Sequence, residues 1–591
     1  MRPSRTYLVA LAAVLAVQLC LMLTTLVPAP HNGGDNAGYV ALAHSLLSQG
    51  TYTELWDPEG LPHTKYPPVF PLLLALWIAG GARSWVALKM VPALFTTLSV
   101  VLAFMWAARR RGPVAGATVG VLVAASTATL WSSHWILSDP PFVTLTLLSL
   151  WAMDRAAAEG PRWEESAPEP LRPWIWVLVG AVAAVLAYFT RSAGLPLLVA
   201  LGAWLLLRRR WVQAVVFGAL AGVPALLWWL RARGTAGAGY VSEFWLVDPY
   251  DPGLGRVGMG GLASRVGGNV VGYVGRHVPE GLVGAQGSWV AALGVALVVL
   301  ALLGWARRLR ERVGVAELFL PLYAGLILLW PTVWSGDRFA LPVLPLLLLY
   351  AGEALHWSVS RLGTRPDTRP DSSTDSSVDR RRASRANTAV VAAGALVLLG
   401  PALVTWRASV RTAVQCTSAV RRAGPFSCWG PTWQEFVGAA RWSGASLPEG
   451  SAVLTRKPRI FFVLSGVPSR TYPFSEDPDA FLAAAGDAGA RYVLLDYVGP
   501  QGPRYVGGVI QALPEAFCSV RSFGAGAAGG ARTQLLGIVP PGSGLGGSVE
   551  VQPDGRASVT VPPCPPELSP VGDAPIPGAG SGVIPLLERR R

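Results

Sequence analysis

Four short segments of the sequence place ionisable side chains beside long apolar blocks. Each segment combines a charged residue with glycine, proline or an aromatic residue, and the four charged residues are Asp35, Lys65, Asp139 and Arg338. A carboxylate can accept a proton and a cation can neutralise a phosphate, so these residue types are candidates for chemistry. Charges next to apolar blocks are costly to place and therefore mark candidate functional positions.

The two acidic residues have both a structural and a functional interpretation. Asp35 precedes a segment, 36–49, whose apolar residues share one helical face with Tyr39. This pattern predicts an amphipathic helix on the membrane surface with Asp35 at its N-cap. Asp139 stands before two prolines at the start of an apolar block, a position that equally fits a helix start. Each is either a helix cap or a catalytic residue.

The two basic residues are open to the same two kinds of interpretation. Lys65 lies between His63 and Tyr66, two positions before a diproline that stops helix propagation. It either neutralises a phosphate at the membrane surface or anchors the chain there by snorkelling. Arg338 opens a late apolar block and needs an anion, which either Asp337 or a bound phosphate supplies.

The composition is that of a membrane protein. Of 591 residues, 52% are hydrophobic and only 14% are charged, with a mean hydropathy of +0.41, whereas a soluble chain is about 25% charged. The net charge is +14. Its arginines cluster at the ends of apolar blocks, at 109–111, 208–210 and 307–312, as positive-inside topology requires. We therefore expect no nucleic-acid partner.

The apolar blocks predict an α-helical polytopic protein with about eleven transmembrane helices. The first block follows Arg2 and Arg5 and is interpreted as a retained signal anchor. With the N-terminus in the cytoplasm, the basic loops all fall inside and the C-terminal part lies outside. The expected location is the inner (plasma) membrane. The expected spans are 7–27, 86–108, 114–132, 141–157, 173–190, 194–207, 212–231, 286–306, 314–334, 338–356 and 388–406.

The chain divides into five expected parts. Residues 1–356 form a transmembrane domain with a first outer loop at 28–85, followed by a disordered cytoplasmic linker, 357–387, and the last span, 388–406. Residues 407–545 form a small extracytoplasmic α/β domain, and 546–591 a disordered Gly/Pro-rich tail.

Finer patterns within the C-terminal part predict individual elements. Strands are expected at 451–455 and 491–497, a hairpin over 517–523 and 534–539, and helices at 479–485 and from a Thr432 cap to near Trp442. Four of the five cysteines, Cys416, Cys428, Cys518 and Cys564, lie in this part. They permit two disulfides in three possible pairings.

Taken together, the four segments resemble the GT-C glycosyltransferases, in the branch that includes protein O-mannosyltransferases and the aminoarabinose transferase acting on lipid A. The resemblance covers roughly residues 1–360 and rests on the order of the motifs. An Asp stands early in the first outer loop, followed by a Lys-aromatic-Pro-Pro entry and an Arg-rich turn after the second span. An acidic residue before the fourth span and Arg-aromatic-x-x-Pro at a late span complete the order. The Thr-Arg-Lys-Pro-Arg of 455–459 is similar to tails on bacterial members.

The resemblance implies an enzyme that passes a sugar from a polyprenyl-phosphate donor, a membrane lipid, to a hydroxyl acceptor. The acceptor is a lipid, a glycan or a protein. Asp35 would be the general base, Asp139 a second catalytic residue, and direct attack on the anomeric carbon would invert its configuration. The implied substrate-binding residues are Tyr39, Lys65, Tyr66, Arg191 and Arg338.

The chain departs from the family pattern at two positions. Several relatives carry an acidic residue before the diproline, where this chain has Thr64-Lys65-Tyr66. No cofactor is expected except, at most, a divalent metal with His63 as its candidate ligand. Asn36 stands where protein mannosyltransferases have the second acid of an Asp-Glu pair, which argues against a protein acceptor. The alternatives are a polytopic transporter and a catalytically inactive envelope scaffold of the same fold.

Overall fold

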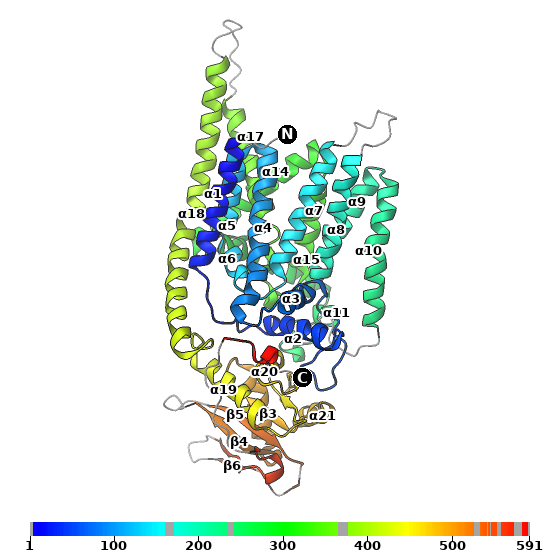
Figure 1. Ribbon diagram of the computed structural model, residues 1–591, viewed down its shortest axis with the longest axis vertical. Coiled ribbons are helices and arrows are strands. Elements are labelled where there is room, and N and C mark those ends of the chain that lie inside the picture. The colour runs from blue at the N-terminus through cyan, green and yellow to red at the C-terminus, as the bar shows by residue number, and fades with distance from the viewer. Residues whose placement is uncertain are drawn as a thin grey trace.

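The computed structural model describes residues 4–159, 171–233, 240–363, 376–524 and 532–540, most of 542–551, and residues 557–571 and 582–588. Long helices form a bundle, and a small α/β domain lies under one end of it (Figure 1). The expected fold class, a helical membrane bundle with a small C-terminal α/β domain, is confirmed.

Each of the eleven expected spans coincides with a helix or with a pair of helices. The first two are α1 (Arg5–Thr24) and α4 (Trp85–Arg111). The third is divided into α5 (Pro113–Ala125) and α6 (Thr127–Ser133), which are bent by 61°. The others are α7 (Asp139–Glu159), α8 (Leu171–Thr190), α9 (Leu195–Leu207), α10 (Trp211–Ala232), α14 (Ser288–Glu311), α15 (Val315–Leu329), α17 (Leu344–Gly363) and α18 (Ser376–Ala423).

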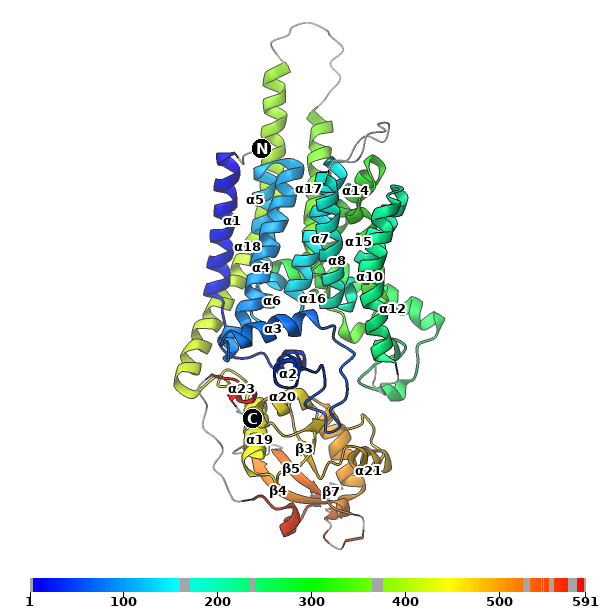
Figure 2. The same cartoon turned by 45° about the vertical axis from the view of Figure 1, so that its right-hand side comes forward.

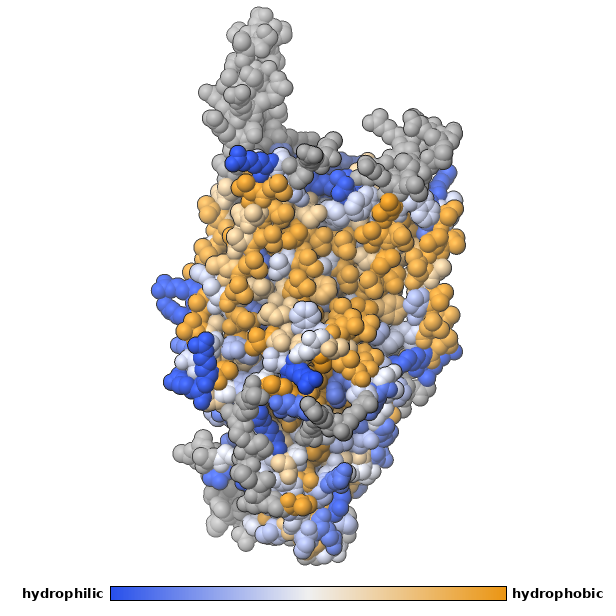
Figure 3. Space-filling view, viewed as in Figure 1, coloured by the Kyte–Doolittle hydropathy of each residue, from blue (hydrophilic) through white to orange (hydrophobic). Residues whose placement is uncertain are grey.

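The flank of the bundle has the surface that a lipid bilayer requires. Hydrophobic side chains form a broad belt between more hydrophilic ends (Figure 3), and Val215 on α10, for example, is 72% exposed. Among the described residues, five helices are long and apolar enough to cross a membrane, or six with the bent pair. The protein is therefore a multi-pass membrane protein. The number of about eleven spans stays a prediction.

Two shorter helices run across the end of the bundle that faces the α/β domain. They are α2 (Gly34–Gln49) and α3 (Val69–Ala79). The amphipathic helix expected near residue 36 is present, but it does not lie on an open membrane surface. Every residue from Asn36 to Ala43 is buried, because α2 lies between α3 and α20 (Pro458–Ser465) of the C-terminal domain (Figure 2).

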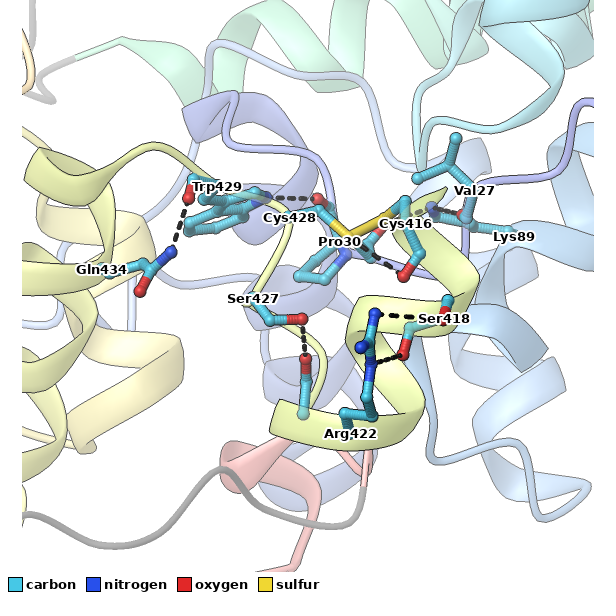
Figure 4. Close-up of a disulfide and its surroundings, with 12 residues drawn as sticks. Val27, Pro30, Lys89, Cys416, Ser418, Arg422, Ser427, Cys428, Trp429 and Gln434 are labelled. Carbon is cyan, nitrogen blue, oxygen red and sulfur yellow. Dashed lines mark hydrogen bonds between the residues drawn. A yellow bond between two sulfur atoms is a disulfide. The ribbon is translucent and has the colours of Figure 1, made fainter. Parts of the chain in front are cut away.

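The segment that leads from α1 into α2 is held from two sides (Figure 4). The ammonium group of Lys89 donates to the carbonyl oxygens of Val27 at 2.7 Å and Ala29 at 2.5 Å. From the other side, the indole N–H of Trp429 donates to the carbonyl of Pro30 at 3.0 Å. Trp429 directly follows the Cys416–Cys428 disulfide, which closes the turn after α18. These contacts fix the start of α2 relative to the C-terminal domain.

The C-terminal domain is built on a five-stranded sheet in the order β2-β1-β3-β5-β4. Its strands are β1 (Val453–Leu454), β2 (Ser469–Arg470), β3 (Tyr492–Leu495), β4 (Phe517–Phe523) and β5 (Thr533–Ile538). The first three are parallel, while β5 pairs antiparallel with β3 and with β4. Helices α19 (Pro431–Ser446), α21 (Pro478–Asp487) and α22 (Gly507–Ala512) accompany the sheet. The expected strands, the β4–β5 hairpin and the helix near 479 are all present.

Two local expectations in this region need correction. The N-cap of α19 is Gly430 rather than Thr432, because Pro431 already occupies the first helical turn. The tail expected to be disordered contains a second antiparallel hairpin, β6 (Ser548–Val551) with β7 (Ala557–Thr560). It also contains α23 (Pro585–Glu588), whose Leu586 is 5% exposed within the core that α2 and α20 share. The second disulfide, Cys518–Cys564, ties this tail to β4.

The expected cytoplasmic linker is helical at both ends, where α17 reaches Gly363 and α18 begins at Ser376. Residues 364–375 lie outside the described residues, so disorder there stays a prediction.

Short helices α11 (Tyr240–Phe244), α12 (Met259–Gly272), α13 (Val278–Val283) and α16 (Asp337–Ala340) complete the bundle.

At the end of the bundle away from the C-terminal domain, Arg110 is buried among three carboxylates. Its guanidinium lies 3.3 Å from Asp154, 3.6 Å from Glu317 and 3.5 Å from Glu353, and its side chain is 5% exposed. Tyr350 donates its hydroxyl to Glu317 at 2.7 Å. Arg110 therefore connects α4 to α7, α15 and α17.

We expect Arg110→Leu to destabilise the protein by about 3–5 kcal/mol, because the buried carboxylates lose the cation they share. Thermal unfolding in detergent measures the effect. The exposed neighbour Arg111 supplies the control, and Arg111→Leu should change stability by no more than about 0.5 kcal/mol. Equal effects of the two substitutions would show that the cluster contributes nothing specific.

Candidate functional site

Asp35 lies in the first turn of α2 but does not cap it. The N-cap is Gly33, and no side chain makes a capping hydrogen bond there. The Asp35 carboxylate points instead to other elements. Oδ1 accepts the hydroxyl of Tyr66 at 2.7 Å, and Oδ2 accepts from Nη1 of Arg338 at 3.1 Å. The cap expected at Asp35 is therefore wrong, and its side chain is committed to a polar cluster at the end of the bundle.

Arg338, at the start of α16, bridges the two carboxylates that the sequence singled out. Besides Asp35, it binds Oδ2 of Asp139 through Nε at 2.8 Å. Asp337 does not provide the side-chain partner, since its carboxylate accepts the backbone N–H of Arg338 at 2.8 Å. Residues about 200 and 300 positions apart thus meet in one ion-pair network.

Asp139, the first residue of α7, holds two guanidinium groups at once. Its Oδ2 lies 2.8 Å from Nη1 of Arg191 and 2.8 Å from Nε of Arg338, and its side chain is 4% exposed. The neighbouring Ser138 accepts from Arg191 at 3.4 Å and shares a hydrogen bond of 2.8 Å with the hydroxyl of Tyr39. Asp139 and Tyr39 are both buried, and the catalytic role expected for Asp139 and the substrate-binding role expected for Tyr39 stay predictions.

The loop before the diproline contributes Tyr66, while its neighbours point elsewhere. Lys65 donates to both carboxylate oxygens of Glu243 in α11, at 2.7 Å each. His63 is completely buried. Its Nε2 accepts the backbone N–H of Tyr66 at 2.8 Å, and Nδ1 lies 2.6 Å from Glu54.

These contacts use both ring nitrogens of His63, so the residue does not fit the role of a metal ligand. Within the part of the chain that the structure describes, no group of three His, Cys, Asp or Glu side chains is arranged to hold a metal ion. No step of the chemistry below is therefore assigned to a metal.

Arg459, in α20 of the C-terminal domain, completes the cluster and was missed by the sequence reasoning. It donates to the hydroxyl of Tyr66, and its Nη1 lies 3.8 Å from Oδ1 of Asp35. Its guanidinium also lies 5.0 Å from the ring centres of both Trp56 and Tyr66. The sequence showed the basic 455–459 segment only as a feature of the tail. Nothing local indicated that it would reach Asp35.

The charges of the cluster keep the Asp35 carboxylate ionised, and its side chain remains partly exposed to solvent. Burial alone would raise its pKa, but Arg338, Arg459 and the hydrogen bond from Tyr66 outweigh burial and hold the pKa well below its usual range. The Asp35 side chain is nevertheless 37% exposed, and Arg338 is 25% exposed. An accessible carboxylate among guanidinium groups is suited to accept a proton beside a bound anion.

The sequence and the fold were compared with those of known proteins. Residues 62–239 match the sequence profile of the family described as dolichyl-phosphate-mannose-protein mannosyltransferase. No curated protein sequence matches the chain. The resemblance to the GT-C glycosyltransferases is confirmed.

Two solved structures share the fold over most of the chain. One is the oligosaccharyltransferase AglB of Archaeoglobus fulgidus, in complex with an inhibitory peptide and a dolichol-phosphate. It is 12% identical with a TM-score of 0.52, over 94% of this chain and 74% of that one. The other is ArnT of Cupriavidus metallidurans bound to undecaprenyl phosphate. It is 15% identical with a TM-score of 0.51, over 91% of this chain and 99% of that one.

Proposed function

From the GT-C fold and a cationic site at one end of it, we propose that this protein transfers a sugar from a polyprenyl-phosphate donor to a hydroxyl acceptor, with Asp35 as general base. The observation that carries the proposal is an ionised, accessible carboxylate held by two guanidinium groups. A polyprenyl phosphate is bound in both structural relatives, together with an inhibitory peptide in one of them, and this supports a lipid-linked donor.

The reaction needs a general base for the hydroxyl that receives the sugar, and cations for the phosphate that leaves. The acceptor hydroxyl gives its proton to Asp35 while its oxygen forms a bond to the anomeric carbon of the sugar. The bond between that carbon and the phosphate oxygen breaks, and its electron pair leaves with the polyprenyl phosphate. Arg338 and Arg191, fixed in advance by Asp139, stabilise the charge that develops on the phosphate. Attack from the side opposite the phosphate inverts the anomeric centre.

Charge distribution supports a site on the extracytoplasmic side. The basic segments 109–111, 208–210 and 307–312 come at the ends of α4, α9 and α14 that point away from the C-terminal domain (Figure 1). By the positive-inside rule that end faces the cytoplasm. We place the cluster around Asp35, and the C-terminal domain, on the outer side of the inner membrane.

The proposal is tested with the purified full chain in detergent, a panel of polyprenyl-phosphate sugars, and an envelope extract that supplies hydroxyl acceptors. We expect that at least one of these donors releases polyprenyl phosphate, which is detected by mass spectrometry. A parallel mass-spectrometric comparison of envelope lipids and glycans, with and without the protein, identifies the acceptor. A chain that binds the donors without turning any over would be the inactive scaffold. Sugar or ion flux in proteoliposomes without transfer would identify a transporter.

The contact between Arg459 and Asp35 predicts a pH effect. Arg459 lowers the pKa of Asp35, so Arg459→Gln should raise it. Because the base acts only when ionised, activity is lost as pH falls through this pKa, and the acid limb of the pH–rate profile should move to higher pH in the variant. An unchanged acid limb would show that Arg459 does not act on the base.

A further inference from the structure

His31, in the segment that leads into α2, is contacted by two nitrogen atoms at one of its ring nitrogens. Its Nδ1 accepts the backbone N–H of Gly33 at 2.9 Å and lies 3.3 Å from the side-chain amide nitrogen of Asn36. The imidazole ring also packs against Trp135, with 4.0 Å between the ring centres. Sequence reasoning had not singled out this histidine.

The close approach of His31 explains the glycine at the N-cap of α2. A Cβ atom at Gly33 would come within 2.8 Å of Nδ1 of His31 and within 3.4 Å of the amide nitrogen of Asn36. A larger residue at this position would therefore push the imidazole away from the first turn of the helix. Gly33 has no side chain to cap α2, and the imidazole holds this turn from outside the helix.

Asn36 connects this contact to the segment before α7. Its Oδ1 accepts the backbone N–H of Ile136 at 2.7 Å, and the residue is 2% exposed. Ile136 directly follows Trp135, so the contacts form a closed ring between the first turn of α2 and the connection from α6 to α7. Asp35 belongs to that turn, and Asp139 comes three residues after Ile136. The ring therefore fixes the two carboxylates relative to each other.

The hydrogen bonds also define the protonation state of His31. Because Ile136 donates to the side chain of Asn36, the atom that receives this bond is the amide oxygen, and the amide nitrogen points to His31. Amide nitrogens and backbone N–H groups only donate, so Nδ1 is the unprotonated nitrogen of a neutral ring. Burial, followed by the charge of Lys89, lowers the pKa of His31 to about 4. The imidazole is therefore neutral at physiological pH.

The neutral imidazole accounts for the residue that follows Asp35. A carboxylate at position 36 could still accept the N–H of Ile136, but it would place a second acceptor against Nδ1 of His31. Two buried acceptors that face each other both lack a donor, which is unfavourable. The amide of Asn36 provides the acceptor and the donor that its two partners require.

We propose that His31 is a positioning residue for the general base: through Asn36, its imidazole holds the first turn of α2, and with it Asp35, in place beside the start of α7. This inference rests on the proposed function, in which Asp35 takes the proton of the acceptor hydroxyl. The effect on the reaction is geometric, because a displacement of about 1 Å in such a group lowers the rate by about 100-fold.

Two variants of His31 separate the acceptor nitrogen from the ring. His31→Phe keeps the packing on Trp135 and has no acceptor, whereas His31→Asn keeps an oxygen near the position of Nδ1 and loses the ring. We expect His31→Phe to lower kcat for sugar transfer by about 10- to 100-fold. His31→Asn should recover much of this loss. KM for the donor should stay unchanged in both, because the cations of the site are intact.

A double variant tests whether His31 acts through Asn36. Asn36→Ala should lower kcat by a factor similar to that of His31→Phe, and the variant with both substitutions should be little slower than either one. Effects that multiply in the double variant would show that the two residues act independently, and would overturn the proposed path. Asn36→Ala also carries the test if His31→Phe does not fold.

Ser45→Ala is the matched control, because it removes a buried hydrogen-bonding side chain from the same helix. The Ser45 hydroxyl accepts the backbone N–H of Thr53 at 3.2 Å and donates to the carbonyl of Thr51 at 3.0 Å, away from Asp35. Thermal unfolding should show a loss of stability in this variant, while kcat stays within about twofold of the unchanged chain.

The comparison of kcat with thermal stability decides the inference. If Asn36→Ala and Ser45→Ala lose similar stability but only Asn36→Ala loses kcat, the contacts of His31 position the base. Normal kcat in His31→Phe or in Asn36→Ala would overturn the inference while the proposed function stands. Failure of the unchanged chain to transfer any sugar would instead reject the proposed function, and the inference with it.

Discussion

Replacement of Asp35 by asparagine is expected to lower kcat for sugar transfer by about 10²- to 10⁴-fold, the usual contribution of a general base. The amide keeps the size of the side chain and still accepts the hydroxyl of Tyr66, which donates to Asp35 at 2.7 Å. It cannot take up the proton of the acceptor hydroxyl. The fold should be preserved, because α2 is not capped by this side chain.

Binding of the donor should survive the same substitution. Asp35→Asn removes a negative charge from a cluster that already contains more cations than carboxylates, so the attraction for a phosphate is maintained or increased. The expected pattern is therefore a large fall in kcat with KM for the donor unchanged or lower. A rise in KM with normal kcat would show that Asp35 binds the substrate and is not the base.

Asp251→Asn provides the control for charge removal. Asp251 is also a carboxylate near the C-terminal domain, paired with Arg504 at 3.0 Å, and it makes no contact with the cluster among the described residues. Its replacement should leave transfer within about twofold of the unchanged chain. If both asparagine variants lose activity alike, a general effect of charge on the outer face would explain the loss, and the assignment of Asp35 would fail.

The long helices and most of the candidate site follow from local patterns in the sequence. Apolar blocks of membrane-spanning length and basic block ends located the helices, because in a bilayer the backbone must satisfy its own hydrogen bonds. Charges beside such blocks located Asp35, Asp139 and Arg338. They meet because each comes at an end of a helix on the same side of the bundle.

What the sequence could not predict depends on contacts between distant elements. Arg459 meets Tyr66 across 393 positions, and no local periodicity contains that information. For the same reason α2 was expected on the membrane surface, where its apolar face alone would place it. The docking of α20 against its other face explains why both faces are buried.

The direction of individual side chains also could not be predicted from the sequence. Lys65 and Tyr66 are adjacent, so the motif predicted that both would act at the site. A single residue step turns Lys65 toward Glu243 while Tyr66 faces Asp35. His63 resembled a metal ligand by type, yet its ring orders the loop through Glu54 and the Tyr66 backbone. Such roles are fixed by geometry, not by residue type.

The second large effect is expected at Arg338, which holds Asp35 and Asp139 together. Arg338→Gln should lower kcat by about 10²- to 10³-fold, the cost of removing one preorganised donor from a developing negative charge. Stability should fall by about 1–3 kcal/mol. This is less than the loss of an isolated buried pair, because Asp139 keeps Arg191 and Asp35 keeps Tyr66. Arg338→Lys keeps the charge, but one ammonium group cannot bridge both carboxylates.

A double variant separates the structural role of Arg338 from its chemical role. In Asp139→Asn with Arg338→Gln, the carboxylate that loses its partner is removed together with the arginine, so the stability lost in Arg338→Gln should be largely recovered. Activity should not recover, because the leaving phosphate still lacks the guanidinium. Recovery of both stability and transfer would mean that Arg338 only neutralises Asp139. Arg191 would then stabilise the phosphate without help from Arg338.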